Sequence, residues 1–213
     1  MSRSVTVLDY GIGNLLNVLR ALEHCGASIH VASQAAQVDV ASTGRLVLPG
    51  VGAFGDGMAE LRARGLDDVV RRFAQTGRPF LGICVGLQMM FEASEEMGEH
   101  RGIGLLAGRV VAVPAVDTAG EPQRIPHIGW RPLQPAADWS STILAKVAPG
   151  ERAYFVHSFS AQPADAAVRL ADVDYGGHCL CAAVHRDNLY GCQFHPERSA
   201  HAGLAMLDAF LAG

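Results

Sequence analysis

The stretch FLGICVGLQMMF, residues 80–91, joins an apolar strand-like run to the start of a predicted helix. Glycines stand two positions before and two positions after Cys84. This is the spacing of a nucleophile elbow, where small neighbours let strand and helix approach closely and the central residue projects from a strained turn. A cysteine at a helix N-terminus favours its thiolate, and the backbone N–H of Val85 can face an oxyanion formed beside the sulfur. The alternative is a buried cysteine whose glycines serve only close packing.

A second stretch, YGCQFHPERS at residues 190–199, supplies the base that a thiolate nucleophile needs. Residues two apart in an extended segment point to the same side. The Glu197 carboxylate can therefore reach the side of the His195 imidazole that faces away from the cysteine. Taken alone, a histidine before a proline at a strand end is more often structural. Together with the elbow, the pattern predicts a Cys84–His195–Glu197 catalytic triad.

The first half of the chain predicts the sheet in which the elbow is set. Short apolar runs alternate with amphipathic stretches, which indicates alternating strands and helices. We predict strands at residues 4–10, 28–33, 45–50 and 78–84, and helices at residues 14–26, 55–65 and 85–96. Such alternation is typical of a parallel sheet with helices on both faces.

From about residue 109 the strand-like runs become closely spaced, so this part is predicted to be antiparallel or mixed. We predict strands at residues 109–116, 153–161, 178–186 and 189–196, a Pro-rich surface excursion at 117–138, and a final helix at 199–213 with Ser199 as its N-cap. The predicted fold is α/β: one domain, residues 1–213, with an open, mostly parallel twisted sheet, helices on both faces and antiparallel additions.

The stretch VLPGVGAFGDGM, residues 47–58, contains a G-x-G-x-x-G at Gly50, Gly52 and Gly55. A dinucleotide-binding fingerprint lies in the first βαβ unit and is followed about 20 residues later by an acidic residue at the end of a strand. Here the glycines follow a later strand, and position 70 falls in DDVVRRF, which reads as helix. We therefore expect these glycines to serve other chemistry.

The composition argues against several classes of function. The chain has 213 residues, 17 basic and 21 acidic side chains and a formal net charge of -4, with no basic run, so nucleic acid is not an expected partner. The N-terminus lacks a signal-peptide core, and no run reaches the roughly 18 apolar residues of a membrane span. Five cysteines cannot all pair within the chain. We expect a cytoplasmic protein with reduced thiols and no membrane contact.

A cluster of histidines and cysteines at residues 178–185 and one further histidine are other candidate site residues. His178, Cys179, Cys181 and His185 are close in sequence, but C-x-C with flanking histidines lacks the paired spacing of a structural zinc site. We expect core residues there and no metal. His157, in YFVHSF, is predicted either to line a pocket or to be a hydrogen-bonded core histidine.

GICVGLQ and FHPE resemble the nucleophile elbow and the His-x-Glu signature of the class I (triad-type) glutamine amidotransferases. Within that class, the chain resembles the amidotransferase subunits of imidazole glycerol phosphate synthases. The resemblance rests on LDYGIGNL, LPGVGAFGDGM, PFLGICVGLQMMFEASEE, IPHIGW, YFVHSF and GCQFHPERS, which occur in the expected order over nearly the whole chain. It implies a flavodoxin-like α/β fold and the hydrolysis of L-glutamine to glutamate and ammonia, with no cofactor.

The resemblance also implies roles for site residues. Gly50, Val51 and Gly52 form an oxyanion strand that directs a backbone N–H, that of Val51, at the glutamine amide oxygen opposite the N–H of Val85. Glycine freedom suits a peptide that must reorient to complete this site.

Residues implied to surround the bound glutamine are Gly52, Gln88, Glu96, His157 and Ser158. In this group, Glu96 pairs with the α-ammonium and Gln88 hydrogen-bonds the substrate. The alternatives are an exposed helix face for Glu96 and a contact at a helix N-terminus for Gln88.

The implied partner is a (β/α)8-barrel cyclase subunit, which receives ammonia through a protected route in a heterodimer. The products are imidazole glycerol phosphate and an aminoimidazole carboxamide ribotide, in histidine biosynthesis. Expected partner contacts are Asn14, Asn17 and Arg20 on one face of the first helix, Trp130 in the Pro-rich excursion, and Arg198, which stands where a lysine is more usual. Two alternatives are a class I amidotransferase that serves another synthase and a catalytically silent regulatory module.

Overall fold

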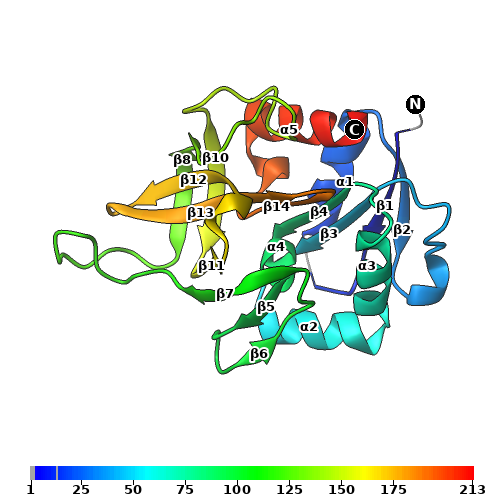
Figure 1. Ribbon diagram of the computed structural model, residues 1–213, viewed down its shortest axis with the longest axis horizontal. Coiled ribbons are helices and arrows are strands. Elements are labelled where there is room, and N and C mark those ends of the chain that lie inside the picture. Colours follow the sequence, from blue (N-terminus) through cyan, green and yellow to red (C-terminus); the bar gives the residue numbers. More distant parts are fainter. Residues whose placement is uncertain (1–2, 13) are drawn as a thin grey trace.

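The structure, a computed structural model, describes residues 3–12 and 14–213. Gly13, inside the quoted stretch LDYGIGNL, lies outside the described residues. The largest feature is an eight-stranded sheet in the order β2-β1-β3-β4-β14-β13-β12-β9 (Figure 1). Its parallel half contains β2 (Ser28–Ala32), β1 (Ser4–Leu8), β3 (Leu46–Gly50), β4 (Phe80–Cys84) and β14 (Leu189–Cys192). Its antiparallel half adds β13 (His178–Arg186), β12 (Arg169–Tyr175) and β9 (Gln134–Pro135).

This arrangement confirms the predicted fold class, because the strand order of the parallel half is that of flavodoxin-like sheets. The strands β3 and β4 are buried at every residue, as expected of central strands covered on both faces. Helix α1 (Leu15–His24) packs with α5 (Ala200–Ala212), whereas α2 (Phe54–Ala63) packs with α3 (Leu66–Ala74) and α4 (Val85–Met89). The helices thus form two groups on opposite faces of the sheet (Figure 1).

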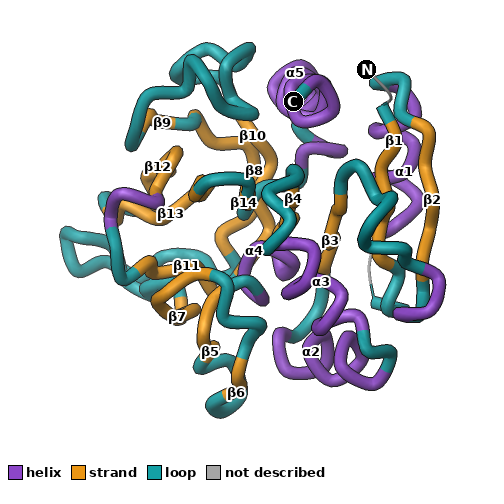
Figure 2. Tube along the Cα trace, turned by 45° about the vertical axis from the view of Figure 1, so that its right-hand side comes forward, coloured by secondary structure: helices purple, strands orange, loops and turns teal. Residues whose placement is uncertain are grey.

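Two smaller sheets lie beside the antiparallel half (Figure 2). One has the order β11-β7-β5-β6 and contains β11 (Phe159–Pro163), β7 (Leu106–Ala112), β5 (Phe91–Ser94) and β6 (His100–Arg101). The other pairs β10 (Arg152–His157) with β8 (His127–Pro132). Short 3-10 turns occur at η1 (Ala35–Gln37), η2 (Ala166–Val168) and η3 (Pro196–Arg198).

The predicted helix over residues 85–96 is wrong beyond its first turns. Helix α4 ends at Met89, and Phe91–Ser94 is strand β5, which pairs with β7 in parallel. Phe91 is buried and Glu92 exposed, which is the alternation of a half-buried strand. Glu96 therefore follows a strand instead of occupying an exposed helix face.

The predicted excursion over residues 117–138 is only partly irregular. Its second half contains β8 and β9, so Trp130 lies on a strand, opposite Tyr154 of β10. Its first half protrudes at the left of Figure 1, where the Thr118 N–H donates to the Gly176 carbonyl at the β12–β13 turn, 2.9 Å away.

Other predicted strand boundaries change where the backbone bends. The predicted strand 153–161 is two strands, β10 and β11, separated at Ser158, and the predicted strand 109–116 corresponds to β7, which ends at Ala112. The predicted strand 189–196 ends at Cys192.

The expectation of core residues at the C-x-C pair holds for one cysteine. Cys181 is buried, but Cys179 is exposed, and its thiol donates to Asp172 Oδ2 at 3.2 Å. His178 and His185 are only half-buried. Cys179 and Cys181 are two positions apart and so lie on the same face of β13. They differ in exposure because that face is covered at Cys181 and open to solvent at Cys179.

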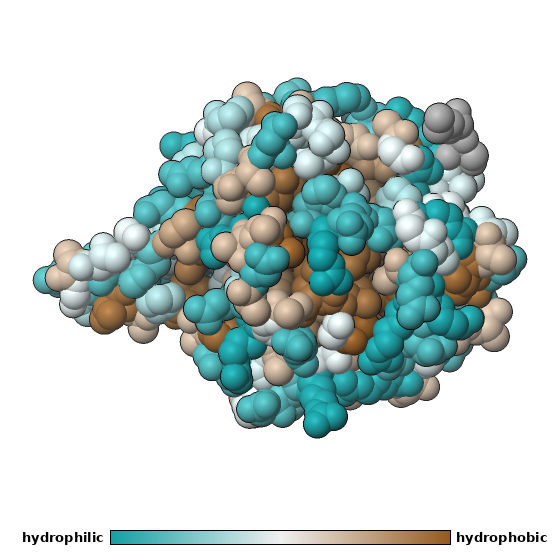
Figure 3. Space-filling model, in the orientation of Figure 1, coloured by the Kyte–Doolittle hydropathy of each residue, from teal (hydrophilic) through white to brown (hydrophobic). Residues whose placement is uncertain are grey.

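The core and the surface follow the usual division. One cluster of buried apolar side chains runs through the parallel sheet and its helices. On the face seen in Figure 3, hydrophobic side chains gather near the middle of the molecule, and hydrophilic ones cover most of its periphery. Within the described residues, no helix is both long and apolar enough to cross a membrane.

Candidate active site

The candidate site forms where three neighbouring parallel strands end. Gly50 at the end of β3 pairs with Cys84 at the end of β4, and Cys192 at the end of β14 pairs with Ile83. The glycine-rich segment after β3, Cys84 and the segment that leads to His195 therefore meet at one edge of the sheet. Carboxyl ends of parallel strands are the usual location of ligand sites in such folds.

The elbow has the strained geometry that the sequence predicts. Cys84 has φ +54° and ψ −111°, and such a positive φ is uncommon for a residue other than glycine. A Cβ on Gly86 would lie 1.8 Å from the Leu48 carbonyl oxygen of β3, so only glycine lets α4 approach the sheet this closely. Cys84 is buried, yet it lines a cavity. The strain therefore holds the thiol at the cavity wall.

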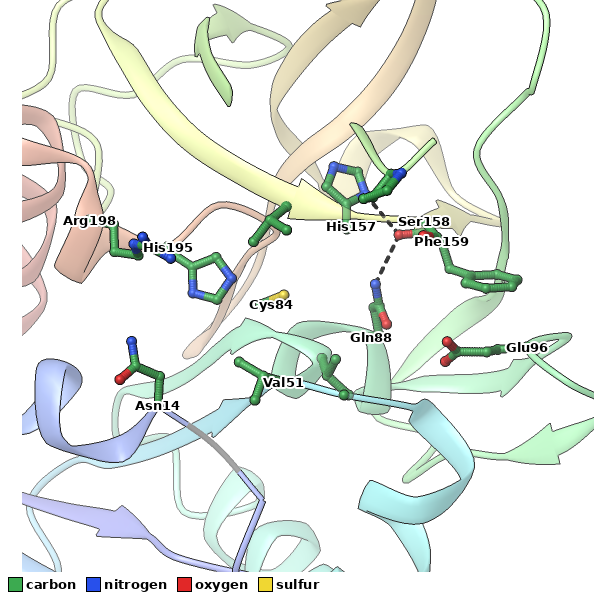
Figure 4. Close-up of a pocket in the computed structure, with 14 residues that line it drawn as sticks. Asn14, Val51, Cys84, Gln88, Glu96, His157, Ser158, Phe159, His195 and Arg198 are labelled. Carbon is green, nitrogen blue, oxygen red and sulfur yellow. Dashed lines mark hydrogen bonds between the residues drawn. The ribbon is translucent and has the colours of Figure 1, made fainter. Parts of the chain in front are cut away.

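His195 and Glu197 are in contact, although not for the predicted reason. His195 Nδ1 lies 2.9 Å from Glu197 Oε1, and both side chains are nearly inaccessible to solvent. The segment is not extended: Pro196–Arg198 is the 3-10 turn η3, and this turn brings the carboxylate back to the imidazole. Figure 4 shows the imidazole directed toward Cys84.

The backbone of His195 is fixed by hydrogen bonds to β10 and to Ser199, the residue before α5. The His195 N–H donates to the Tyr154 carbonyl at 2.9 Å, and the Ser199 hydroxyl donates to the His195 carbonyl at 2.6 Å. The same hydroxyl accepts from the Tyr154 N–H at 2.9 Å. Ser199 does occupy the N-cap position of α5, but its side chain makes no capping hydrogen bond because it is used here.

The electrostatics favour a charged His195. Burial lowers its pKa, but interactions with Cys84 and Glu197 raise it by more, so the pKa lies above its usual value. Nε2 forms no hydrogen bond of standard geometry with any residue in the described part of the chain. His195 thus lies between Cys84 and Glu197, and its interactions with these two side chains stabilise the charged imidazolium.

The cavity beside Cys84 measures about 320 Å³, near the lower end of the range for small-molecule sites. Most residues that the sequence predicts to bind substrate line it, namely Val51, Gly52, Val85, Gln88, Glu96, His157 and Ser158. His195 also lines it, whereas Glu197 lies behind the imidazole and Gly50 faces a smaller hollow next to Glu197.

Glu96 is tied to the segment that follows the glycine-rich loop. Its Oε2 accepts a hydrogen bond of 2.7 Å from the Phe54 N–H, the first residue of α2. Gly52 in the same loop has φ +84°, which L side chains rarely adopt. The carboxylate thus contacts both the cavity and the element that anchors the loop.

His157 fits both of its predicted roles, since it lines the cavity and is hydrogen-bonded in the core. Its Nδ1 lies 2.9 Å from the Phe159 carbonyl, which can only accept, so Nδ1 carries the proton. Nε2 then accepts from Nδ1 of the buried His127, 3.0 Å away. Burial lowers the pKa of His127 to about 3 and that of His157 to about 4, so both are neutral at neutral pH.

Three buried polar residues at the site were missed from the sequence. His127 stands in the quoted stretch IPHIGW, and Gln193 in GCQFHPERS. The Tyr10 hydroxyl donates to the Pro49 carbonyl at 2.9 Å, at the start of the glycine-rich segment. Their polar side chains within apolar runs are the signal that points to them.

Two of the five predicted partner residues line the cavity, and two others connect to those two, one by a hydrogen bond and one through the Tyr154 ring. Asn14 and Arg198 line the cavity itself, and Asn17 on α1 donates to Asn14 at 2.9 Å. Arg20 is exposed on the same helix. Trp130, 43% exposed, makes an edge contact with the Tyr154 ring, and the Arg198 guanidinium lies over that ring at 4.6 Å.

No group of three or more His, Cys, Asp or Glu in residues 3–12 and 14–213 has the arrangement of a metal site.

Comparisons with known proteins agree with one another. Residues 6–212 match the family described as "Glutamine amidotransferase class-I". The chain is 47% identical over 211 residues to "Imidazole glycerol phosphate synthase subunit HisH 1" of Legionella pneumophila (strain Lens), covering 98% of each chain. It is 45% identical to "Imidazole glycerol phosphate synthase subunit HisH" of Aquifex aeolicus, over 96% of this chain and 94% of that relative. The solved structure of PurLQS from Thermotoga maritima shares the fold, with a TM-score of 0.76 at 21% identity, covering 100% of this chain and 99% of that chain.

Proposed function

The chain belongs to the class I glutamine amidotransferase family, and on that premise we propose that it is the glutaminase subunit of an imidazole glycerol phosphate synthase. It hydrolyses L-glutamine to glutamate and ammonia. One observation carries the chemistry: a cysteine in a strained elbow faces a buried histidine whose other ring nitrogen is 2.9 Å from a buried carboxylate. The names of the relatives, at 43 to 47% identity over nearly the full length, support the synthase.

In the first half of the reaction, His195 takes the Cys84 proton on Nε2, and the thiolate attacks the side-chain carbonyl carbon of glutamine. Glu197 holds the imidazole in orientation and stabilises its positive charge. The tetrahedral oxyanion accepts hydrogen bonds from the backbone N–H groups of Val51 and Val85. His195 then protonates the leaving nitrogen, so ammonia departs and a γ-glutamyl thioester remains on Cys84.

In the second half, His195 acts again as a base. It removes a proton from water, which attacks the thioester carbonyl, and the same two N–H groups stabilise the new oxyanion. Collapse of this intermediate breaks the carbon–sulfur bond, releases glutamate and returns the thiol. No cofactor is needed, because every proton is carried by His195.

The cavity offers complementary groups for the rest of glutamine. The Glu96 carboxylate lies at the cavity wall and pairs with the α-ammonium of glutamine. One of its oxygens accepts the hydrogen bond from the Phe54 N–H. Gln88 uses both of its N–H groups within the protein, so its carbonyl oxygen is available to the substrate. His157 and Ser158 complete the opposite wall.

Released ammonia needs an acceptor site that is shielded from water, because free ammonia protonates and diffuses away. We place a (β/α)8-barrel cyclase subunit over the cavity mouth, where Asn14 and Arg198 line the cavity. Its contact surface would extend to Asn17 and the exposed Arg20 on α1, and to Trp130, which contacts the Tyr154 ring beneath Arg198. The heterodimer forms imidazole glycerol phosphate and an aminoimidazole carboxamide ribotide, a step of histidine biosynthesis. Such a biosynthetic enzyme works in the cytoplasm.

The test is glutamate release from glutamine by the purified chain, alone and with the cyclase subunit plus its nucleotide ligand. We expect low activity alone, a large increase in the complex, and loss of activity in Cys84→Ala. Cys179→Ala, which removes an exposed thiol remote from the cavity, is the matched control and should retain full activity. A chain that never co-purifies with the cyclase at micromolar concentration instead serves another synthase, and a complex without glutaminase activity identifies a catalytically silent module.

A further inference from the structure

A fully buried glutamine that this mechanism does not use lies beside the reacting sulfur. Gln193 directly follows β14, and its backbone N–H donates to the Ala182 carbonyl at 2.8 Å. Because Cys192 pairs with Ile83 across β14 and β4, the next residues along these two strands, Gln193 and Cys84, are also neighbours. Gln193 Nε2 lies 3.6 Å from Cys84 Sγ, within the range of a hydrogen bond to sulfur.

The orientation of the Gln193 amide follows from the Phe159 backbone carbonyl, which can only accept hydrogen bonds. The Phe159 carbonyl accepts from Gln88 Nε2 at 2.9 Å, a contact drawn in Figure 4. Gln88 therefore presents its amide nitrogen on this side, and its second N–H donates to Gln193 Oε1 at 3.1 Å. With its oxygen engaged, Gln193 turns its NH2 group to the sulfur. The opposite orientation would set two donors against each other and direct a carbonyl oxygen at the thiolate.

Titratable groups from several elements lie near Cys84. Tyr10, from the segment after β1, and Cys192, from β14, both have pKa values raised by burial, so both are neutral near pH 7. The charged side chains nearby are His195 with Glu197 behind it, and Glu96 and Arg198, which line the same cavity as Cys84. Among the described residues, Gln193 is the side chain that donates a hydrogen bond to the sulfur in this geometry.

We propose that Gln193 is a further catalytic residue of this site, whose side-chain N–H donates to the Cys84 sulfur and stabilises it as the thiolate. The inference rests on the proposed function. When the Cys84 proton moves to His195 Nε2, the sulfur gains a negative charge and the N–H···S contact becomes charge-assisted. The contact also fixes the position of the sulfur, because Gln193 Oε1 is held by Gln88, which faces the substrate.

The test compares Gln193→Met with the wild type in the complex with the cyclase subunit. Methionine fills a similar volume without a donor or an acceptor. Cys84 alkylation by iodoacetamide is followed as a function of pH without glutamine, and glutaminase kinetics are measured in parallel. We expect alkylation at pH 7 to slow about 10-fold or more, the pH of half-maximal alkylation to rise by about one unit or more, and kcat to fall more than KM rises. Gln162→Met, at an exposed position of β11, should change none of these.

The readouts separate the possible outcomes. An unchanged alkylation profile with a raised KM shows that Gln193 only anchors Gln88, and overturns the proposal. If Gln193→Met fails to fold, Gln193→Asn keeps a buried amide that is too short to reach both partners, and the same expectations apply to it. A wild-type complex without glutaminase activity or selective Cys84 alkylation refutes the proposed function itself, whereas an active wild type with an unaffected Gln193→Met refutes only this inference.

Discussion

Gly86, two residues after Cys84, gives a quantitative test of how closely helix α4 packs against strand β3. In Gly86→Ala, the new Cβ would lie 1.8 Å from the Leu48 carbonyl oxygen and 2.9 Å from its carbonyl carbon, whereas real Cβ contacts under 3.0 Å are essentially absent. Helix α4 and strand β3 must therefore separate by about 1.2 Å or more. Leu48 lies in the middle of β3, which pairs with both β1 and β4, so the displacement falls on α4 and the elbow.

The expected cost follows from this displacement. Overpacking a well-packed core costs about 1–3 kcal/mol and occasionally more, and this contact is with backbone that cannot rotate away, so we expect about 3 kcal/mol. For a chain of this size that corresponds to a fall in Tm of about 6–12 °C. A shift of about 1 Å in reacting groups can cost about 10²-fold in rate, so kcat/KM should fall at least that far.

Thermal unfolding and glutaminase kinetics of the cyclase complex measure both effects. Gly57→Ala is the matched control, because Gly57 is also a buried helical glycine of ordinary φ. The tightest contact of its Cβ would be the flexible Met89 sulfur at 3.3 Å, and the Tyr10 ring at 3.7 Å lies at an ordinary van der Waals distance. Gly57→Ala should be neutral or stabilising by up to about 1 kcal/mol. A Gly86→Ala variant that matches the wild type in Tm and in kcat/KM would refute the reasoning.

Three further predictions address separate parts of the site. Glu197→Gln keeps the shape but removes the charge that stabilises the His195 imidazolium, so kcat should fall about 10²- to 10⁴-fold with little change in KM, and an unchanged kcat contradicts the role. Glu96→Gln keeps an oxygen for the α2 N-terminus but loses the charge toward the α-ammonium, so KM for glutamine should rise about 10-fold, and an equal KM removes Glu96 from binding. Burial lowers the pKa of His127 to about 3 and that of His157 to about 4. Below about pH 6.5 these two histidines therefore bind protons in the unfolded chain but stay neutral in the folded chain. The free energy of unfolding from urea titrations should therefore fall by about 1.4 kcal/mol per pH unit for each histidine between about pH 6 and 5, and His127→Phe should lower that slope; equal slopes contradict the assignment.

The elbow could be predicted from the sequence because its signal is local. Two glycines and a cysteine within five positions specify a strained turn, and the structure has φ +54° at Cys84. The parallel sheet was predictable for a similar reason, since each strand is a short apolar run followed by an amphipathic helix. The His195–Glu197 contact was predicted from an extended segment and is made instead by the 3-10 turn η3.

The elements that were missed depend on distant partners. The run that follows α4 continues without a glycine or proline, so nothing local marks the change from helix to β5, which pairs with β7. Strand β8 lies in a Pro-rich stretch and becomes a strand by pairing with β10, as at Trp130 and Tyr154. Such pairing is tertiary, and local propensity does not encode it.

The same limit explains the site residues that the sequence left unassigned. Gln193 meets Cys84 across 109 positions of sequence, through the pairing of β14 with β4. His127 meets His157 across 30 positions, through the pairing of β8 with β10. In each case the residue type was visible but its partner was not, because the register of distant strands decides which polar groups meet.

The central claim is that Cys84 is the nucleophile that attacks glutamine. It is tested most directly by treating the cyclase complex with a diazo-ketone analogue of glutamine and mapping the modified peptide. We expect one label per chain, on Cys84 alone among the five cysteines, slowed by added glutamine and accompanied by complete loss of glutamate release. Labelling at another residue, or full glutaminase activity in a complex labelled at Cys84, would contradict it.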